Sequence, residues 1–130
     1  MATLFSRIVQ GEVPCHKVAE NEDFLAFMDS MPLRWGHVLV IPKQETDYIF
    51  DLEDELLGSM MVFAKEVARK IKIAFPCKKV GVTVIGLEVP HAHIHLVPMN
   101  SMNDMNFSQD KLTLSQEELA GIAQAIRDAA

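Results

Sequence analysis

The sequence predicts an α+β fold in which helices cover an antiparallel sheet of about five strands. Several short apolar runs separated by polar turns predict the strands, and one longer run of apolar residues at helical spacing predicts a helix that covers one face of a sheet. Most connections between the predicted strands are too short for the crossovers that parallel strands require, which favours antiparallel pairing. Because 49% of the 130 residues are hydrophobic, we expect one domain over residues 1–130 with a substantial core.

The N-terminal part of the chain is predicted to form one short helix and three strands. Apolar residues at helical spacing in residues 4–9 predict the helix, which stops near a glycine. Residues 16–20 and 24–28 are strand-like runs joined by a polar turn, as in a hairpin. Residues 37–41 are almost continuously apolar, as a strand buried on both faces would be, and Pro42 ends this run.

The longest regular pattern follows these strands. In residues 56–71 apolar side chains recur every three or four positions, with charged residues on much of the opposite side, which predicts an amphipathic helix of roughly five turns. Residues 79–85 and 92–97 predict two further strands. A C-terminal helix is expected to begin at Ser115, which is followed three residues later by Glu118 in a capping-box pattern.

Three histidines alternate with apolar residues at the last predicted strand. Because side chains on a strand point to alternate faces, His91, His93 and His95 are expected to share one face while the intervening residues pack on the other. Successive imidazoles would then lie about 6.6 Å apart along the strand, close enough to act on one ligand. Histidine can exchange a proton near neutral pH, act as a nucleophile or bind a metal, so this face is the candidate site of chemistry.

Three interpretations of this histidine row are open. A zinc site is one, but a strand places only two neighbouring imidazoles comfortably on one ion, and no acidic or cysteine partner lies nearby in the sequence. A solvated sheet face without a site is another, although alternating imidazoles offer no packing advantage over Thr or Tyr. Covalent or acid–base catalysis is the interpretation that we favour, with no metal and no cofactor.

Composition argues against several functions. The formal net charge is -6 and the only basic cluster is residues 78–79, which disfavours binding to nucleic acid. No apolar run reaches the ~20 residues of a membrane helix and no signal-peptide pattern is present, so we expect a cytoplasmic protein without a membrane partner. Cys15 and Cys77 lie far apart in the sequence and are expected to be reduced thiols.

Residues 91–97 resemble the signature of the histidine-triad (HIT) family, His-x-His-x-His followed by two apolar residues. The resemblance extends to residues 5–14, 27–32 and 36–43, and covers the chain from about residue 4 to residue 99. It is closest to the Hint-like branch of nucleotide hydrolases. It implies a HIT-like fold, purine nucleoside monophosphate derivatives as substrates, and a homodimer whose two sheets join into one.

The resemblance also implies the activity of a nucleotidyl hydrolase or transferase. His93 matches the nucleophile, which would cleave the α-phosphate bond of a nucleoside phosphoramidate or related adduct through a nucleotidyl-histidine intermediate. His95 is placed to stabilise charge on the non-bridging oxygens, while His91 and His37 match histidines that hold tautomer and orientation. The alternatives are a dinucleoside polyphosphate hydrolase, and a nucleotide-binding or interaction protein with residual catalysis.

Three further residues match positions that hold the nucleoside in this family. Asp29 matches the acid that takes the ribose hydroxyls, and Phe5 and Ile8 match apolar walls around the base. The alternative for Asp29 is a turn acid at the end of a strand. For Phe5 and Ile8 the alternative is packing in the core.

The chain departs from the family pattern in three places. Zinc-containing members carry Cys-x-x-Cys where this chain has residues 3–6, and often a histidine just after the Pro-Lys that is here residues 42–43, so structural zinc is disfavoured. Residues 86–89 read Gly-Leu-Glu-Val where Hint-like sequences have Gly-Gln-Ser-Val, which removes two polar phosphate contacts. Glu88 is either a general acid, since a nearby phosphate favours its protonated form, or a solvent-facing carboxylate. The segment from Asn106 onward has no counterpart in the family pattern.

Overall fold

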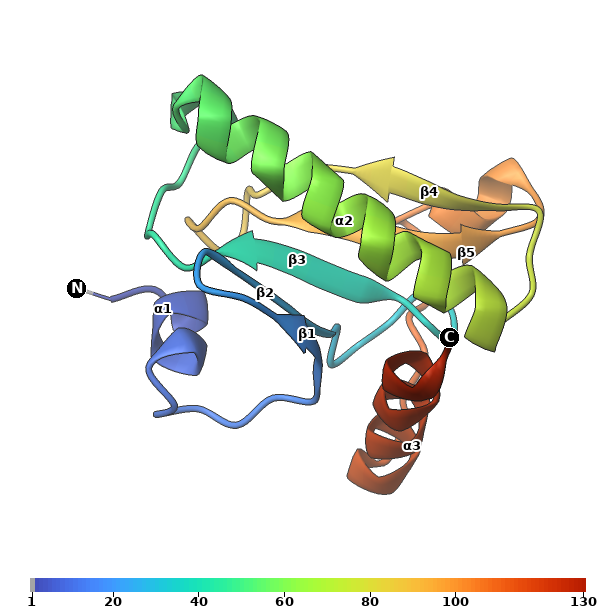
Figure 1. The fold of residues 1–130 in the computed structure, drawn as a ribbon. Coiled ribbons are helices and arrows are strands. Elements are labelled where there is room, and N and C mark those ends of the chain that lie inside the picture. Colours follow the sequence, from blue (N-terminus) through green and yellow to red (C-terminus); the bar gives the residue numbers. More distant parts are fainter. Residues whose placement is uncertain (1) are drawn as a thin grey trace.

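The computed structural model describes residues 2–130 and contains, within that range, five strands, three α-helices and two short 3₁₀ helices (Figure 1). The strands are β1 (Lys17–Glu20), β2 (Phe24–Met28), β3 (Val38–Pro42), β4 (Lys79–Thr83) and β5 (Ile94–Met99). The helices are α1 (Leu4–Val9), α2 (Asp54–Ala74) and α3 (Gln116–Asp128), and the 3₁₀ helices are η1 (Ile49–Asp51) and η2 (Met102–Met105).

The strands form one sheet in the order β1-β2-β3-β5-β4, and every neighbouring pair is antiparallel. The predicted hairpin is β1–β2, whose turn is held by the side chain of Asn21, which accepts the N–H groups of Asp23 and Phe24 at 2.9 and 2.8 Å. The chain reaches β4, at the far edge of the sheet, through α2 (Figure 1). The predicted α+β fold, with its long helix and its C-terminal helix, is therefore confirmed.

The two faces of the sheet differ because side chains alternate along each strand. On β3, Val38 and Val40 belong to the core under α2, whereas Leu39 and Ile41 pack with the apolar residues of α1. The long helix lies across the first of these faces (Figure 1) and buries side chains at the predicted three- and four-residue steps. These are Met60, Ala64, Val67 and Ile71. The opposite face of the sheet, which packs with α1 and is called the α1 face, is the one on which His93 and His95 lie.

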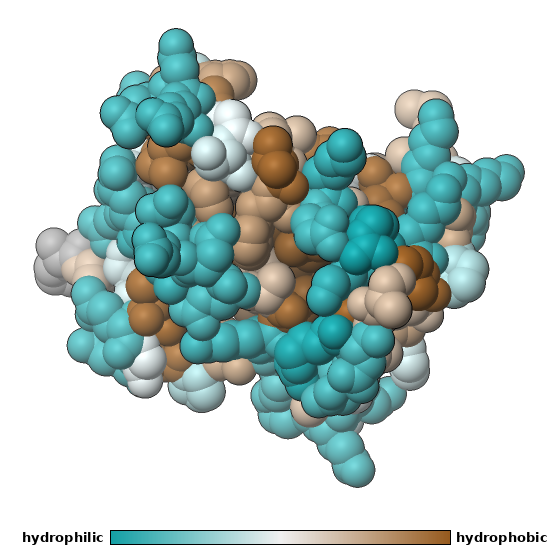
Figure 2. Space-filling model, viewed as in Figure 1, coloured by the Kyte–Doolittle hydropathy of each residue, from teal (hydrophilic) through white to brown (hydrophobic). Residues whose placement is uncertain are grey.

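The outer side of α2 meets solvent. Figure 2, drawn from the same direction as Figure 1, shows mostly hydrophilic side chains around a narrower band of hydrophobic surface. Three apolar residues of α2 are exposed, and they are Met61, Val62 and Ile73. Within residues 2–130, the helices lack the combination of length and apolar composition that crossing a bilayer requires.

Two strand boundaries differ from the prediction. β5 begins at Ile94 rather than Ala92, because Pro90 has no N–H and the N–H groups of His91 and Ala92 bond to loop carbonyls at 2.8 and 2.7 Å rather than to a neighbouring strand. β4 likewise ends at Thr83, two residues before the predicted end. His91 and His93 therefore lie ahead of the sheet ladder, and only His95 is paired within it.

Candidate active site

A cavity of about 760 Å³ opens on the α1 face of the sheet. Its walls come from parts of the chain that are far apart in sequence, namely α1, the end of β2, the loop at residues 85–89 and the segment around residues 107–111. His95, on β5, and His93, just before the start of β5, both line the cavity. The volume lies within the range typical of small-molecule sites.

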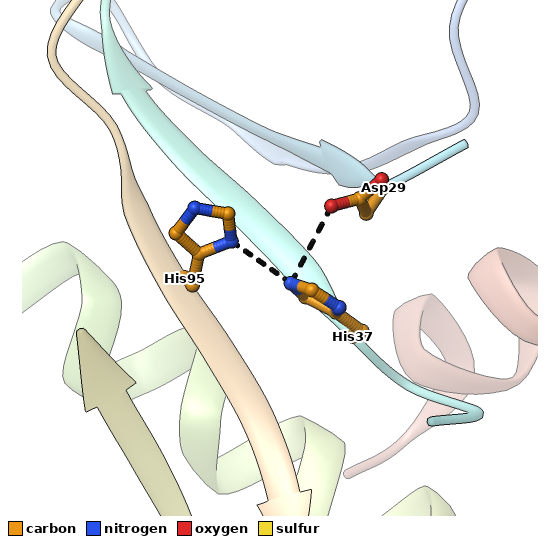
Figure 3. A group of neighbouring side chains, drawn as sticks. All are labelled: Asp29, His37 and His95. Carbon is orange, nitrogen blue, oxygen red and sulfur yellow. Dashed lines mark hydrogen bonds and ion pairs between the residues drawn. The ribbon is translucent and has the colours of Figure 1, made fainter. Parts of the chain in front are cut away.

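The register of the sheet brings Asp29, His37 and His95 together on this face (Figure 3). Asp29 directly follows β2 and His37 directly precedes β3, and the N–H of Asp29 donates to the carbonyl of His37 at 3.2 Å. His95 lies opposite Leu39, two residues along β3 from His37, so the two imidazoles share a face. Nε2 of His37 is 3.0 Å from Nδ1 of His95 and 3.5 Å from Oδ2 of Asp29.

Hydrogen bonds fix the tautomers of His37 and His95. The N–H of Leu33 donates to Nδ1 of His37 at 3.0 Å, so this nitrogen is an acceptor and the ring proton must be on Nε2. Nε2–H of His37 then donates to Nδ1 of His95. The proton of His95 is consequently on its Nε2. A buried backbone N–H thus determines, through two rings, that His95 presents a hydrogen-bond donor on the cavity side of the sheet.

His93 has the opposite tautomer. Its Nδ1 lies 2.7 Å from the carbonyl oxygen of His91, and because a carbonyl can only accept, Nδ1 carries the proton and donates. Nε2 of the neutral ring is therefore an unprotonated lone pair. The ring centroids of His93 and His95 are 4.9 Å apart, and the ring of Phe5 meets His93 edge-on at 5.0 Å. The cavity wall consequently holds a basic nitrogen beside an N–H donor.

His91 connects the site to α1. Its Nε2–H donates to the carbonyl of Pro42 at 2.8 Å, so its Nδ1 accepts the hydroxyl proton of Thr3 at 2.9 Å. One carboxylate oxygen of Glu45 accepts the hydroxyl of Ser6 at 2.6 Å and the N–H of Thr3 at 2.9 Å. These bonds lower the pKa of Glu45, with the Ser6 hydroxyl as the largest cause. The network holds the start of α1 against the histidine segment.

Neither candidate group of ligands fits a metal ion. One candidate group lies where zinc-containing members have thiolates, and it consists of Thr3, Ser6, Glu45 and His91. Neutral hydroxyls do not replace thiolates as zinc ligands. The four side chains also already bond to one another, Thr3 to His91 and Ser6 to Glu45. Donor atoms of Asp29, His37 and His95 lie within 4.8 Å of one another. A metal on Nε2 of His37 would move the ring proton to Nδ1, where it would face the Leu33 N–H.

Burial keeps the inner histidines neutral. It lowers the pKa of His37 to about 3 and that of His95 to about 4, and the positive charge of a neighbouring histidine acts in the same direction. Burial also lowers the pKa of His91 and raises the pKa of Asp29. Because His37 is neutral near pH 7, its contact with Asp29 is not an ion pair there.

The depressed pKa values predict acid sensitivity of the fold. Histidine has an ordinary pKa of 6.5, so between about pH 4 and pH 6.5 the unfolded chain binds more protons at His37 and His95 than the folded chain does. The free energy of unfolding should fall as the pH falls through this window, by up to about 1.4 kcal/mol per pH unit for each histidine. Urea unfolding at several pH values measures the slope. His37→Gln should flatten it, and a slope unchanged by that substitution would contradict this origin.

The structure brings most of the residues singled out in the sequence to one place. Six of them line the cavity, and they are Phe5, Ile8, Asp29, Glu88, His93 and His95. His37 and His91 are fully buried behind this wall. Phe5 and Ile8 also belong to the core cluster of α1, so core packing and cavity lining are both realised. The side chain of Glu88 is exposed at the cavity.

Sequence reasoning missed several residues of the cavity wall, among them Phe107 and Lys111. The ring centroid of Phe107 lies 4.8 Å from that of His95 and 6.0 Å from that of His37, and Lys111 also lines the cavity. Both come from the segment before α3, which is held to the loop after β2 where the N–H of Leu112 donates to the carbonyl of Pro32 at 2.8 Å. A lone aromatic residue and a lone lysine in a polar segment carry no periodic signal that could have placed them here.

The sequence comparison agrees with this arrangement. A family model described as the HIT domain matches residues 10–102, which include all four buried histidines. This chain belongs to the HIT family. The match covers β1 to β5 of the HIT protein and leaves out α1 and the segment 107–111, although both line the cavity.

Relatives and solved structures extend the similarity over the whole chain. An uncharacterised HIT-like protein of Helicobacter pylori is 40% identical over 97 residues, 72% of this chain and 93% of that protein. The adenosine 5'-monophosphoramidase of Schizosaccharomyces pombe is 30% identical over 128 residues, which cover 97% of this chain and 96% of the relative. A crystal structure of a Hit-like protein from Bartonella henselae superposes with a TM-score of 0.85 at 28% identity, covering 98% and 96% of the two chains.

Proposed function

We propose that this HIT protein is a nucleotidyl hydrolase that cleaves the α-phosphate bond of nucleoside phosphoramidates or related nucleotide adducts. The observation that carries the proposal is the unprotonated Nε2 of His93, which the bond from Nδ1–H to the carbonyl of His91 leaves available in the cavity wall. The fixed N–H donor of His95 beside it supports the same conclusion. The name of the relative from Schizosaccharomyces pombe supports a phosphoramidate as substrate.

The reaction proceeds in two displacements. In the first, Nε2 of His93 attacks the α-phosphorus, a P–N bond to the imidazole forms, and the bond from phosphorus to the leaving nitrogen breaks as that nitrogen gains a proton. In the second, water attacks the same phosphorus and gives up a proton, which restores the acid used in the first step, while the bond to His93 breaks and the nucleoside monophosphate leaves. Nε2–H of His95 donates to a non-bridging oxygen, and stabilises the charge that develops there in both steps. The preset tautomers mean that no proton has to be rearranged before attack.

The cavity offers matching groups for the nucleoside. We assign Phe5 and Ile8 to the purine base, since α1 presents both side chains to the cavity. Asp29 is assigned to the ribose hydroxyls. One of its carboxylate oxygens accepts the N–H of Met31 at 2.9 Å, which fixes the group at the cavity wall while the carboxylate retains capacity to accept further hydrogen bonds.

Product release from defined substrates tests the proposed function. The wild-type protein should release AMP from adenosine phosphoramidate faster than it releases any nucleotide from diadenosine tetraphosphate. Cleavage of the tetraphosphate alone would replace this function with that of a dinucleoside polyphosphate hydrolase. AMP binding without turnover of either substrate would contradict an enzyme and leave a nucleotide-binding protein.

Glu88 is proposed as the general acid that protonates the leaving nitrogen. Glu88→Gln should lower kcat about 10²-fold for adenosine phosphoramidates of alkylamines, which need the proton, and only slightly for those of an activated arylamine. Steady-state rates with the two substrates measure the difference. An equal loss with both leaving groups would show that Glu88 does not transfer the proton.

A homodimer is proposed to form along β4. The sheet has two edges, and β1 is covered by α3, whose Arg127 donates to the carbonyl of Lys17. β4 and the residues after it expose apolar side chains at the other edge, and these are Val82, Val84 and Ile85.

The oligomeric state of the wild type and of two variants tests the proposed interface along β4. Val82→Lys places like charges at the pairing edge and should weaken dimerisation at least about tenfold, whereas Val62→Lys on the outer side of α2 should not. Sedimentation equilibrium of the two variants and the wild type measures the dissociation constants. A wild-type protein that sediments as a monomer, or equal weakening by both variants, would contradict pairing along β4.

A further inference from the structure

The segment between η2 and α3 is irregular, yet a hydrogen bond within it shapes its start and two contacts fix it beside the active site. The side chain of Asn106 accepts the N–H of Ser108 at 2.9 Å, and Phe107 packs edge-on against the ring of His95. Six residues beyond Asn106, the N–H of Leu112 donates to the carbonyl of Pro32. Lys111 lies next to this last anchor, so its side chain starts from a defined place on the cavity rim.

Lys111 is the only lysine or arginine among the described residues that line the cavity. Asp29 and Glu88 line the same cavity, and burial keeps His37 and His95 uncharged. The charge of Lys111 reaches the inner site. It adds to the effect of burial in lowering the pKa of His37 and His95, and it opposes the rise that burial causes in the pKa of Asp29. Within residues 2–130 its ammonium group is not in an ion pair, so its charge is not already neutralised by a carboxylate.

An anionic substrate would need this cation. The chain has a formal net charge of -6, and the acidic side chains of Asp29 and Glu88 line the cavity that a phosphate would enter. The loop before the histidines offers Leu87, which has no polar side-chain group, and Glu88, which as the proposed general acid carries a proton but no positive charge. Neutral imidazoles can donate hydrogen bonds to phosphate but cannot balance its charge.

We propose that Lys111 binds the phosphate of the nucleotide, so that the segment before α3 supplies the cationic part of the active site. This inference rests on the proposed function for the identity of the ligand as a nucleotide. Lys111 contacts the phosphate as a compact point charge, while His93 and His95 act on the phosphorus and its oxygens. Phe107 and the Leu112 anchor are positioning groups that keep the lysine at the cavity.

Binding of AMP and of adenosine separates the phosphate contact from the rest of the site. Calorimetric titration should show that Lys111→Met weakens AMP binding about tenfold or more and leaves adenosine binding unchanged. Lys111→Arg should restore most of the AMP affinity. Lys65→Met, on the exposed side of α2, is the matched control and should bind both ligands like the wild type. Raising the salt concentration should weaken AMP binding in the wild type more than in Lys111→Met.

The outcomes separate this inference from the proposed function. Equal AMP affinity of Lys111→Met and wild type, with AMP release from adenosine phosphoramidate intact, would overturn the role of Lys111 and leave the hydrolase standing. Equal weakening of AMP and adenosine would also overturn it, because the variant would then have moved the segment rather than removed a charge. Selective loss of AMP binding in a protein that does not turn over would support Lys111 and refute the hydrolase.

Discussion

Replacing His93 with alanine should lower the rate of AMP release from adenosine phosphoramidate by at least about 10³-fold. Of the two neighbouring histidines His93 and His95 in the cavity wall, only His93 has an unprotonated nitrogen that is free to attack, and the variant loses it. Neutral His95 cannot substitute, because its Nδ1 is occupied by His37 and its Nε2 carries the proton. Binding of AMP should change only a few-fold, since the base, ribose and phosphate contacts remain.

Chemical rescue distinguishes a lost nucleophile from a damaged site. His93→Gly leaves a cavity beside Phe5, and added imidazole should restore part of the rate by acting as the nucleophile in the vacant place. Circular dichroism and AMP titration verify that each variant is folded. A His93→Ala variant that binds AMP and retains more than about a tenth of the wild-type rate would contradict nucleophilic attack by His93.

The second large effect is expected at His95. His95→Ala removes the N–H donor that we assign to the non-bridging oxygen, and loss of one such preorganised donor typically lowers kcat about 10²- to 10³-fold. The loss should appear in kcat with little change in KM, because the donor acts on charge that develops in the transition state. Steady-state kinetics with adenosine phosphoramidate gives the two constants separately.

His37 should act on the same step without touching the substrate. His37→Phe removes the bond that occupies Nδ1 of His95, so the proton of His95 is free to move to that nitrogen and the cavity-side donor is partly lost. We expect a decrease in kcat in the same direction as for His95→Ala but smaller, and almost no further decrease when the two substitutions are combined. Fully additive losses would show that His37 works independently of His95.

The sequence predicted the sheet and the position of the histidines well because these depend on local alternation. Leu39 and Ile41 face α1 while Val38 and Val40 face α2, as a buried strand requires. His95 on β5 and His93 just before it likewise both line the cavity. The start of β5 was less predictable. The bonds of His91 and its neighbour go to loop carbonyls whose positions no local pattern specifies.

The connections that tune the site were beyond sequence reasoning because they join distant segments. Glu45 and Ser6 are separated by 39 positions and hold α1 to the histidines through a hydrogen-bond network that neither segment predicts alone. Leu33 determines the tautomer of His95 through a backbone N–H, which is independent of its side chain. Lys111 reaches the cavity only because Leu112 is anchored to the loop after β2.

The central claim is that His93 carries the nucleotide during the reaction, and trapping the intermediate tests it most directly. Enzyme mixed with excess radiolabelled adenosine phosphoramidate is stopped within one turnover in alkaline denaturant, because a P–N bond to imidazole hydrolyses in acid. The account predicts one adenylyl group on the peptide that contains His93, and none in His93→Ala. Label on another residue, or turnover that proceeds without any labelled protein and inverts the configuration at phosphorus, would contradict it.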